Sequence, residues 1–396
     1  MKFTFSEFDG ERGRFLSPDD LFPHPQLVEF LLQHGQDALD ALPEASEQIQ
    51  QLINEMIQAG LLEKGEGGEL KLTPRMVRGM QHRAFLEIFR GLRAGVRDGH
   101  ATPEAGRAGE RSEGTKPYQW GDALSELALG PTMRNAMARV ASERGAGAGA
   151  GGSEAGSLLP LKLRDGDFEL HNVESTADSA LVILIDLSGS MMRYGRHIAA
   201  KRVAMGMRAL VREKFPLDTV EFVGFSSVAE PIEERDLPLV MPKPISTRAW
   251  EVRVKVPLKD AAKTHQHFTN LQHGLRLARQ KLSRRGAANK QMFIITDGEP
   301  TAHLSGEHKD TLHLIYPPNP RTAKATLEEA FRCTQAGIRI STFALIEEYH
   351  GMEWVGFVDQ FTRLVRGVAF YCTAGDLGAT IMESYLAGKR QKKPLG

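Results

Sequence analysis

The chain has 396 residues, in which 50 lysines and arginines balance 50 aspartates and glutamates. This length allows two or three domains, one of them large enough for a full α/β core. A net charge of zero excludes a global electrostatic attraction to nucleic acid or to an anionic membrane, so partners must be recognised by local features.

Cysteine content and hydropathy bear on the cellular compartment. Cys333 and Cys372 are the only cysteines, and two thiols in a chain of this size fit core positions in a reducing compartment better than a disulfide. The first ten residues lack the apolar core of a signal peptide, and no apolar run approaches the length of a membrane helix. We therefore expect a cytoplasmic protein that does not bind a membrane.

Residues 1–93 have the pattern of a small helical domain. Apolar residues recur at helical spacing, and Thr73 and Pro74 are residue types that begin a helix. Together with a short strand at 69–72, these helices resemble half of a winged helix-turn-helix. A DNA-binding protein would use the arginines of the last helix as phosphate contacts, namely Arg75, Arg78, Arg83, Arg90 and Arg93. We favour a docking domain with a solvated basic face, because the net charge is zero and no second basic cluster supports DNA binding.

Three segments follow that differ in composition. Residues 94–115 contain almost no apolar side chains, which predicts a linker. Residues 116–143 combine Tyr118 and Trp120 with a helix-like stretch, and such an aromatic island indicates a docking segment. Residues 144–157 are almost wholly Gly, Ala and Ser, which predicts a second, flexible linker.

The segment 158–390 alternates strands and helices and is followed by a short basic tail at 391–396. A hairpin about Asp165–Gly166 is expected to open this domain, and 226–264 is predicted to be irregular apart from an edge strand at 252–256. Further strands and helices are expected at 180–185, 196–214, 220–225, 270–283, 292–296, 321–336, 338–345, 352–365 and 368–371, with a final helix to about 386. This order predicts a doubly wound, mostly parallel α/β sheet, preceded by the mainly helical region.

Oxygen-bearing residues stand at the ends of the predicted strands. Asp186, Ser188 and Ser190 follow the first buried strand, Thr269 precedes a helix, and Asp297 follows the central strand. Parallel sheets bind their ligands beyond the carboxyl ends of the strands. Oxygen ligands without sulfur or imidazole suit a hard cation such as magnesium. The competing interpretation is that these residues only cap a helix or close a turn.

The pattern Asp186-Leu-Ser-Gly-Ser190, Thr269 and Thr296-Asp-Gly298 resembles the metal-ion-dependent adhesion site of the von Willebrand factor type A (VWA) family in all five ligand positions. The resemblance implies that Ser188, Ser190 and Thr269 supply hydroxyl oxygens, while Asp186 and Asp297 ligate Mg²⁺ (or Mn²⁺) directly or through water. The family commonly has a glycine before the threonine. This chain has Phe268 there, which leaves the shape of that loop open.

Such a site predicts binding rather than catalysis. Two carboxylates offset the charge of the cation, and magnesium keeps waters in a near-octahedral shell, so one position stays open to a carboxylate of a partner protein. The chain has no phosphate-binding loop and no Gly-x-Ser-x-Gly elbow. Without a nucleophile and base, we expect no catalytic residues and no enzyme.

Histidines cluster in sequence around these loops, but their spacing matches no known zinc site. We expect them to be surface or interface residues. They are His197, His265, His267, His273 and His303.

Several stretches resemble a narrower branch of the VWA family, including Thr269-Asn-Leu-Gln-His-Gly-Leu275 and Thr296-Asp-Gly-Glu-Pro-Thr-Ala-His303. They are similar to bacterial intracellular VWA proteins related to magnesium-chelatase D-type and carbon-monoxide-dehydrogenase accessory proteins. This resemblance implies an adaptor for a MoxR-type AAA+ ATPase or its client, in assembly, metal insertion or remodelling. The alternative is a nucleic-acid-binding regulator acting through the winged-helix-like segment 47–93, with salt-sensitive binding.

Overall fold

The structure is a computed structural model that describes residues 25–42, 47–65, 67–92, 111–118, 127–147, 162–173, 178–247, 249–346 and 352–390. The chain divides into two compact units. The first combines the N-terminal residues up to Arg97 with Asp178–Gln391, and the second contains Asp98–Ala177. The last predicted segment, the basic tail at 391–396, lies outside the described residues.

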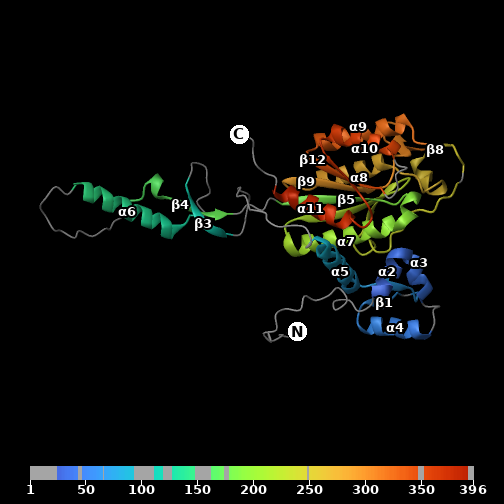
Figure 1. The fold of residues 1–396 in the computed structure, drawn as a ribbon, viewed down its shortest axis with the longest axis horizontal. Coiled ribbons are helices and arrows are strands. Elements are labelled where there is room, and N and C mark those ends of the chain that lie inside the picture. Colours follow the sequence, from blue (N-terminus) through green and yellow to red (C-terminus); the bar gives the residue numbers. More distant parts are fainter. Residues whose placement is uncertain are drawn as a thin grey trace. The chain divides into compact units, whose positions relative to one another are not determined.

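A six-stranded sheet forms the centre of the first unit (Figure 1). Its spatial order is β13-β12-β9-β5-β6-β7, and every neighbouring pair is parallel except β6 with β7. The strands are β5 (Ser179–Asp186), β6 (Thr219–Phe225), β7 (Ala229–Ile232), β9 (Asn289–Thr296), β12 (Ile338–Leu345) and β13 (Val368–Cys372). The predicted α/β fold with a mostly parallel sheet is confirmed.

Helices cover both faces of this sheet (Figure 1). One face carries α7 (Arg196–Lys214) and α11 (Leu377–Arg390), and the other carries α8 (Leu271–Ser283), α9 (Pro320–Gln335) and α10 (Met352–Val365). Successive side chains of β5 alternate between the two cores: Ile183 packs on the α7 side and Leu184 on the α8 side. Because both faces are buried, the strand is a continuous apolar run rather than an alternating one.

The N-terminal residues form helices and a small two-stranded sheet. The elements are α2 (Pro25–His34), α3 (Gln36–Ala41), α4 (Glu47–Gln58), β1 (Leu62–Lys64), β2 (Leu70–Leu72) and α5 (Pro74–Leu92). The predicted cap of α5 is present, since the Met76 N–H donates to Thr73 Oγ1 at 3.2 Å. β1 pairs with β2 in antiparallel register across the glycine-rich turn.

Helix α5 packs against the α/β unit. A methyl group added at Gly206 of α7 would lie 2.7 Å from Ile88 Cδ1, and one added at Gly378 of α11 would lie 2.9 Å from Ile88 Cγ1. Buried residues of α2 to α5 and of the α7 side of the sheet therefore belong to one hydrophobic core. The N-terminal residues, predicted as a separate domain at 1–93, lie in the same compact unit as the α/β sheet, and the apolar face of α5 is buried against α7 and α11.

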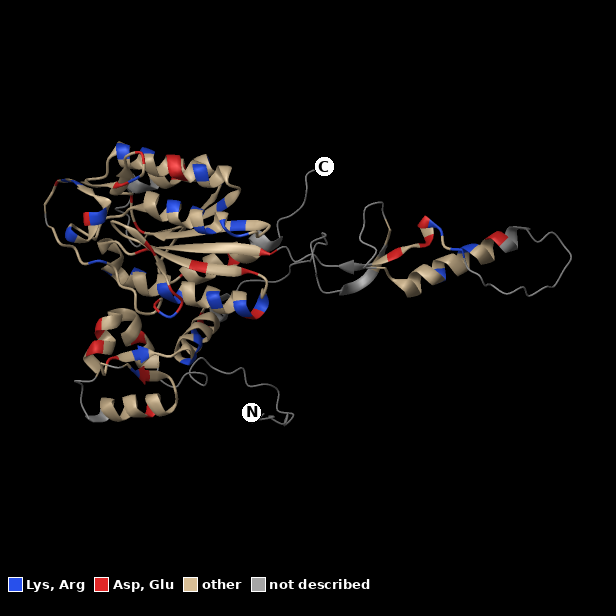
Figure 2. Cartoon of the chain, turned by 180° about the vertical axis from the view of Figure 1, so that it is seen from behind, with Lys and Arg blue, Asp and Glu red and all other residues tan. Residues whose placement is uncertain are grey.

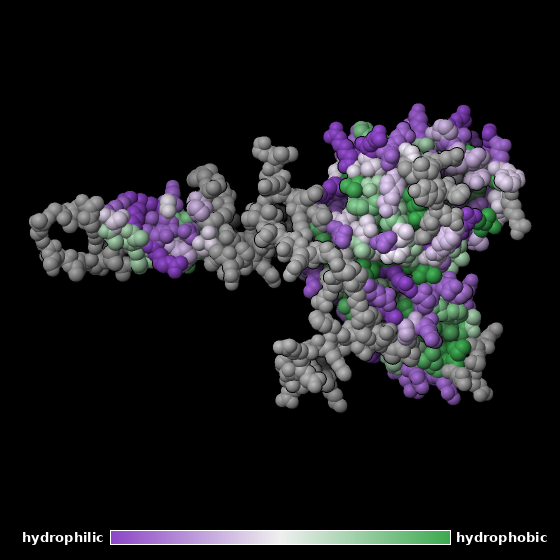
Figure 3. All heavy atoms as spheres, viewed as in Figure 1, coloured by the Kyte–Doolittle hydropathy of each residue, from purple (hydrophilic) through white to green (hydrophobic). Residues whose placement is uncertain are grey.

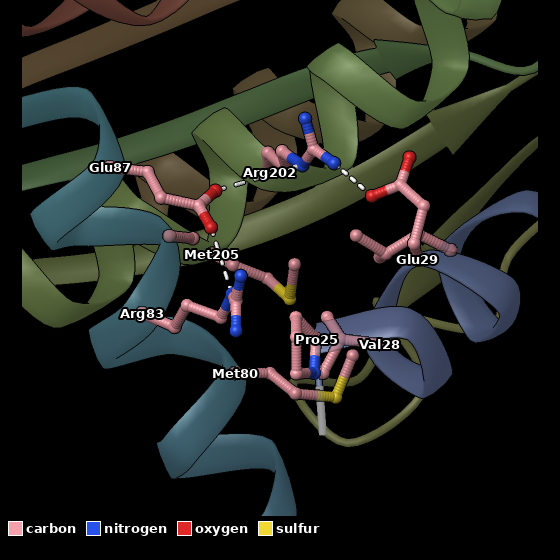
Figure 4. A pocket seen from close by; sticks show the side chains of 10 residues that line it. Pro25, Val28, Glu29, Met80, Arg83, Glu87, Arg202 and Met205 are labelled. Carbon is pink, nitrogen blue, oxygen red and sulfur yellow. Dashed lines mark hydrogen bonds and ion pairs between the residues drawn. The ribbon is translucent and has the colours of Figure 1, made fainter. Parts of the chain in front are cut away.

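Charged side chains link the same elements (Figure 4). Arg83 of α5 pairs with Glu87 at 2.8 Å, and Arg202 of α7 lies 3.9 Å from Glu87 and also pairs with Glu29 of α2. These residues border a cavity of about 30 Å³ between α2, α5 and α7. Arg83 thus forms an ion pair with Glu87 within the protein.

A second contact between the N-terminal helices and the α/β unit involves the turn after α2. Gly35 adopts φ 61°, and a Cβ there would lie 2.4 Å from the Leu239 carbonyl oxygen. Beneath this loop, the fully buried Lys201 donates from Nζ to the Pro238 carbonyl at 3.0 Å. Burial lowers the pKa of Lys201 to about 7. The loop at residues 238–241 is therefore contacted both by Gly35 of the N-terminal helices and by Lys201 of α7.

A small antiparallel sheet has the spatial order β10-β11-β8. It consists of β8 (Val252–Pro257), β10 (Ala302–Ser305) and β11 (Thr311–Tyr316). The edge strand expected at 252–256 is present as β8, whereas β7, β10 and β11 were not predicted. The apolar residues of β8, β10 and β11 form a separate core cluster, in which Leu304, Leu312 and Leu314 are almost fully buried.

The second unit joins segments that are distant in sequence. β3 (Arg111–Pro117) pairs in antiparallel register with β4 (Glu169–Val173), next to α6 (Leu129–Gly147). Arg139 of α6 bonds both carboxylate oxygens of Asp167, at 2.9 and 2.7 Å.

Three sequence predictions differ from this arrangement. The predicted linker 94–115 ends in strand β3, and α6 extends to Gly147 in the predicted linker 144–157, although two of these four residues are glycines, which disfavour helix. The predicted hairpin is wrong: Asp165–Asp167 is a turn of 3-10 helix whose Asp167 carboxylate accepts the Arg164 backbone N–H, so residues 169–173 pair with β3 instead. The first strand of the main sheet, by contrast, lies where it was predicted, at 180–185, as β5 (Ser179–Asp186). Of the docking segment 116–143, residues 119–126 lie outside the described part.

The surface of the first unit is mixed. Hydrophilic side chains dominate over α9 and α10, and hydrophobic ones reach the surface in scattered areas (Figure 3). Cys333 and Cys372 are both free and buried. Within the described ranges, no helix is both long and apolar enough to cross a bilayer.

Candidate metal centre

Asp186 is the last residue of β5 and is fully buried. Its Oδ1 accepts the backbone N–H of Ser188 at 2.8 Å, and its Oδ2 accepts the hydroxyl of Thr296 at 2.6 Å. β5 and β9 are adjacent and parallel, so their carboxyl ends bring Asp186 and Thr296 together. The carboxylate is therefore fixed in orientation at the edge where parallel sheets bind ligands.

A chain of hydrogen bonds extends from this edge to the second carboxylate. The Ser188 and Ser190 hydroxyl oxygens are 3.1 Å apart, and the Ser190 hydroxyl donates to Asp297 Oδ1 at 2.7 Å. The Asp297 side chain has no exposed surface. Four of the five predicted ligands, Asp186, Ser188, Ser190 and Asp297, thus lie together.

The two aspartates create an electrostatic demand for a cation. Burial raises the pKa of Asp186, and the neighbouring charge of Asp297 raises it further. Two carboxylates with two serine hydroxyls between them form a hard, all-oxygen donor set. A bound divalent cation would offset the repulsion between the carboxylates, so these residues fit Mg²⁺ or Mn²⁺.

Arg196 is a residue of this site that sequence analysis did not identify. It is the first residue of α7, and its Nη1 donates to Asp297 Oδ2 at 2.6 Å. Its guanidinium carbon lies 5.2 Å from the centre of the Tyr194 ring, and its side chain is only 11% exposed. The arginine offsets one of the two negative charges. The sequence clue was a cation directly after the serine loop.

Thr269, the fifth predicted ligand, is held through its backbone. Its N–H donates to Thr301 Oγ1 at 2.9 Å, and its carbonyl accepts the Thr301 N–H at 2.9 Å. Two residues earlier, the His267 carbonyl accepts the Gly189 N–H at 3.0 Å, which joins the threonine loop to the serine loop. The Thr269 hydroxyl makes no hydrogen bond within the described part of the chain, so it remains available to a ligand.

Phe268 anchors the threonine loop. Its side chain is 4% exposed and packs in the core cluster of the small sheet, while its N–H donates to Ser227 Oγ at 3.2 Å. Phe268 does not have a positive φ; among the described non-glycine residues, those that do are Tyr194, Lys309 and Arg366. The backbone at this position therefore does not require glycine, and the aromatic ring fixes the loop by burial.

Gly189 fits where three loop segments converge. A Cβ at this residue would lie 2.6 Å from Ile245 Cγ1, 3.2 Å from His267 Cβ and 3.2 Å from the Lys243 carbonyl oxygen. The Lys243 N–H also donates to the Leu187 carbonyl at 2.8 Å. A larger residue would separate the serine loop from its neighbours, which explains a glycine between the two serines.

The five predicted histidines occupy different environments. His197 is buried in α7, and His303 contacts Thr322 and stacks on His313. Ser246 Oγ lies 2.8 Å from His265 Nδ1 and 3.2 Å from His267 Nδ1. His273 accepts the Ala229 N–H. In the described ranges, no three His, Cys, Asp or Glu residues converge as a metal site of that composition.

Three of the arginines considered for DNA binding, Arg75, Arg78 and Arg83, have contacts within the protein. Arg75 donates to the Ala59 carbonyl at 2.7 Å, and Arg78 to the Pro74 carbonyl at 3.1 Å. α4 contains no lysine or arginine, and its ribbon carries no blue in Figure 2. Arg93 lies outside the described residues, as does the side chain of Arg90. No observation on the described residues favours the nucleic-acid alternative.

Comparisons with known proteins divide the chain where the structure does. A family model described as "Rv0959-like protein, vWA domain" matches residues 179–386, and one described as "Rv0959-like protein, third domain" matches residues 110–173. The gap between the two matches falls between β4 and β5, the boundary between the compact units.

Individual relatives are more distant. The chain is 27% identical over 345 residues to "Uncharacterized protein Rv0959" of Mycobacterium tuberculosis, covering 86% of this chain and 45% of that protein. It therefore spans less than half the length of the curated relatives it matches. Among solved structures, the PilB minor pilin of Streptococcus sanguinis is 14% identical (56% of this chain, 64% of that chain, TM-score 0.41). The vWF domain of the type V pili tip protein Mfa5 of Porphyromonas gingivalis is 13% identical (56% and 99%, TM-score 0.37). Because the vWA-domain model matches more than half of its residues, this chain belongs to the Rv0959-like proteins with a vWA domain.

Proposed function

We propose that this chain is a non-catalytic VWA adaptor that binds Mg²⁺ (or Mn²⁺) through Asp186, Ser188, Ser190, Thr269 and Asp297. The supporting observation is that two buried carboxylates, Asp186 and Asp297, lie at one sheet edge with two serine hydroxyls between them. The unpaired Thr269 hydroxyl on the adjoining loop completes an oxygen-only donor set.

The cation would serve to capture a carboxylate. Magnesium retains waters when a protein supplies only part of its coordination shell, and an Asp or Glu of a partner protein can replace one of them. The chain's own residues hold and orient the cation, and no nucleophile is required. By resemblance to intracellular VWA proteins, the partner is a cytoplasmic AAA+ ATPase of the MoxR type or its client.

Titration calorimetry with MgCl₂ and MnCl₂ tests the metal site. We expect the Asp186→Asn variant to bind at least about 100-fold more weakly than wild type, about 2.8 kcal/mol, because the substitution keeps the side-chain shape and removes one of two charges. Asp236→Asn, at an exposed aspartate of the same unit, is the matched control. Equal affinity of wild type and Asp186→Asn would refute the metal assignment.

Partner capture tests the adaptor role separately. A tagged chain is incubated with a MoxR-type ATPase from the same genome at constant Mg²⁺ and ATP, because removing magnesium would also disable the ATPase. We expect Asp186→Asn to lose capture and Asp236→Asn to retain it. Capture unchanged in Asp186→Asn would contradict the carboxylate-binding model even where the metal titration supports the site.

A further inference from the structure

A second cavity lies on the outer side of α8, separate from the candidate metal centre. Its volume is about 200 Å³, and its polar lining comes from His273, Arg276 and Gln280 of α8 and from His308 and Lys309 in the turn between β10 and β11. Three leucines complete its walls. Arg276 follows Thr269 by seven residues, roughly 10 Å along a helix axis, so the cavity is distinct from the metal centre.

The charges that line this cavity are all positive. Arg276 and Lys309 are both half-buried, and neither side chain forms an ion pair or hydrogen bond with the rest of the described chain. No aspartate or glutamate lines the cavity. Asp310, next to Lys309, bonds the Thr311 hydroxyl at 3.3 Å. Two partly desolvated cations without an internal partner among the described residues that line one cavity make it electrostatically suited to an anion.

His273 contributes a neutral donor. Its Nδ1 accepts the Ala229 N–H at 3.0 Å, which assigns the ring proton to Nε2. Burial lowers the pKa of His273 to about 4, and the positive charge of Arg276 contributes. The ring is therefore uncharged at neutral pH and presents an N–H beside the guanidinium of Arg276.

Lys309 is presented by an unusual backbone conformation. It adopts φ 56°, the left-handed region, and its N–H closes the turn onto the Gly306 carbonyl at 3.2 Å. A non-glycine residue pays a conformational cost in this region. The turn thus fixes the lysine at the rim of the cavity, opposite a helix that holds Arg276.

We propose that this cavity binds a small phosphoryl anion, either inorganic phosphate or a compact phosphomonoester. Two cations with additional neutral donors match a dianion, whereas a single carboxylate needs only one of the cations. The cavity is smaller than those that enclose drug-sized ligands, which excludes enclosure of a whole nucleotide. The guanidinium of Arg276 supplies the planar donor pair that recognises phosphate oxygens.

The test is calorimetric titration of the full chain in EDTA, so that metal binding cannot contribute. The probes are inorganic phosphate, glycerol 3-phosphate and acetate, each at constant ionic strength. We expect both phosphoryl probes to bind, and both Arg276→Gln and Lys309→Gln to weaken binding at least tenfold. If only one phosphoryl probe binds, it identifies the source of the anion.

Arg284→Gln is the matched control, because Arg284 is exposed just beyond the end of the same helix. It removes the same charge outside the cavity and is expected to bind phosphate as wild type does. Circular dichroism establishes that each variant is folded. The proposal is overturned if neither phosphoryl probe binds to wild type, if Arg276→Gln and Lys309→Gln both bind the phosphoryl probes as Arg284→Gln does, or if acetate binds as tightly as the phosphoryl probes.

Discussion

At the scale of single residues, the candidate metal centre contains more buried negative charge than positive charge. Asp186 and Asp297 are both buried, and Arg196 is the one cation that contacts either carboxylate among the described residues. Its contact neutralises part of the site but leaves Asp186 with no cationic partner. An arginine at this position would stabilise the site without metal and would repel an arriving divalent cation.

Removing the charge of Arg196 therefore tests whether this arginine opposes the binding of a divalent cation. We expect Arg196→Gln to raise Mg²⁺ affinity by about tenfold, about 1.4 kcal/mol, because the net negative charge of the site increases. Calorimetric titration measures the change. Arg193→Gln, at an exposed arginine of the same loop, is the control and is expected to change the affinity little. A weaker affinity in Arg196→Gln would mean that the arginine chiefly positions Asp297.

At the scale of elements, sequence patterns located the main sheet well. β12 and α10 begin and end where the apolar periodicity predicted, and the ends of β5 and β9 placed the aspartates at one edge. In the small sheet β8 was predicted, but β10 was missed because it has only four residues and joins β11 through a turn that contains the left-handed Lys309. β11 did carry an alternating pattern, Leu312 and Leu314, that could have revealed it.

The same small sheet explains why a phenylalanine is accommodated at position 268. Phe268 in place of the usual glycine left the shape of this loop open, and in the structure the ring packs in one core cluster with residues of β8, β10 and β11 and anchors the loop that carries Thr269. The sequence could thus identify Thr269 as a candidate hydroxyl ligand, but it could not reveal that the packing of Phe268 on the small sheet supports the loop. Much of that support comes from β10 and β11, which lie more than thirty residues further along the chain.

We expect Phe268→Ala to lower the free energy of unfolding by about 3 kcal/mol. We also expect it to weaken Mg²⁺ binding, because the space left by the missing ring would loosen the loop that carries Thr269. Denaturant unfolding and calorimetry give the two quantities. Phe331→Ala, at a phenylalanine of α9 that is 47% exposed, is the matched control. Unchanged metal affinity in a destabilised Phe268→Ala variant would show that Thr269 does not depend on this anchor.

At the scale of the whole molecule, the N-terminal helices and the α/β sheet share one core. Ile88 of α5 lies against Gly206 of α7 and Gly378 of α11, and the close approach has no signature in a single sequence. The pairing of β3 with β4 was missed for the same reason, since their residues lie more than fifty positions apart. Local periodicity predicts elements, but the contacts that assign elements to a domain are long-range.

Shared packing predicts shared unfolding. We expect Ile88→Ala to destabilise by about 2 kcal/mol and to increase the hydrogen exchange of α5 and β5 amides together. Native-state hydrogen exchange resolves the two elements. Ile49→Ala, on α4 at 38% exposure, is the control and is expected to leave both protected. Faster exchange in α5 alone would indicate that the N-terminal helices unfold as an independent domain.

The central claim is that Asp186, Ser188, Ser190, Thr269 and Asp297 hold a divalent cation. The most direct test is a crystal structure of the full chain grown with millimolar MnCl₂, with data collected at the manganese absorption edge. We predict an anomalous peak within about 2.3 Å of the three hydroxyl oxygens, those of Ser188, Ser190 and Thr269. Absence of this peak, with Arg196 still bonded to Asp297 and the Thr269 hydroxyl turned away, would contradict this claim.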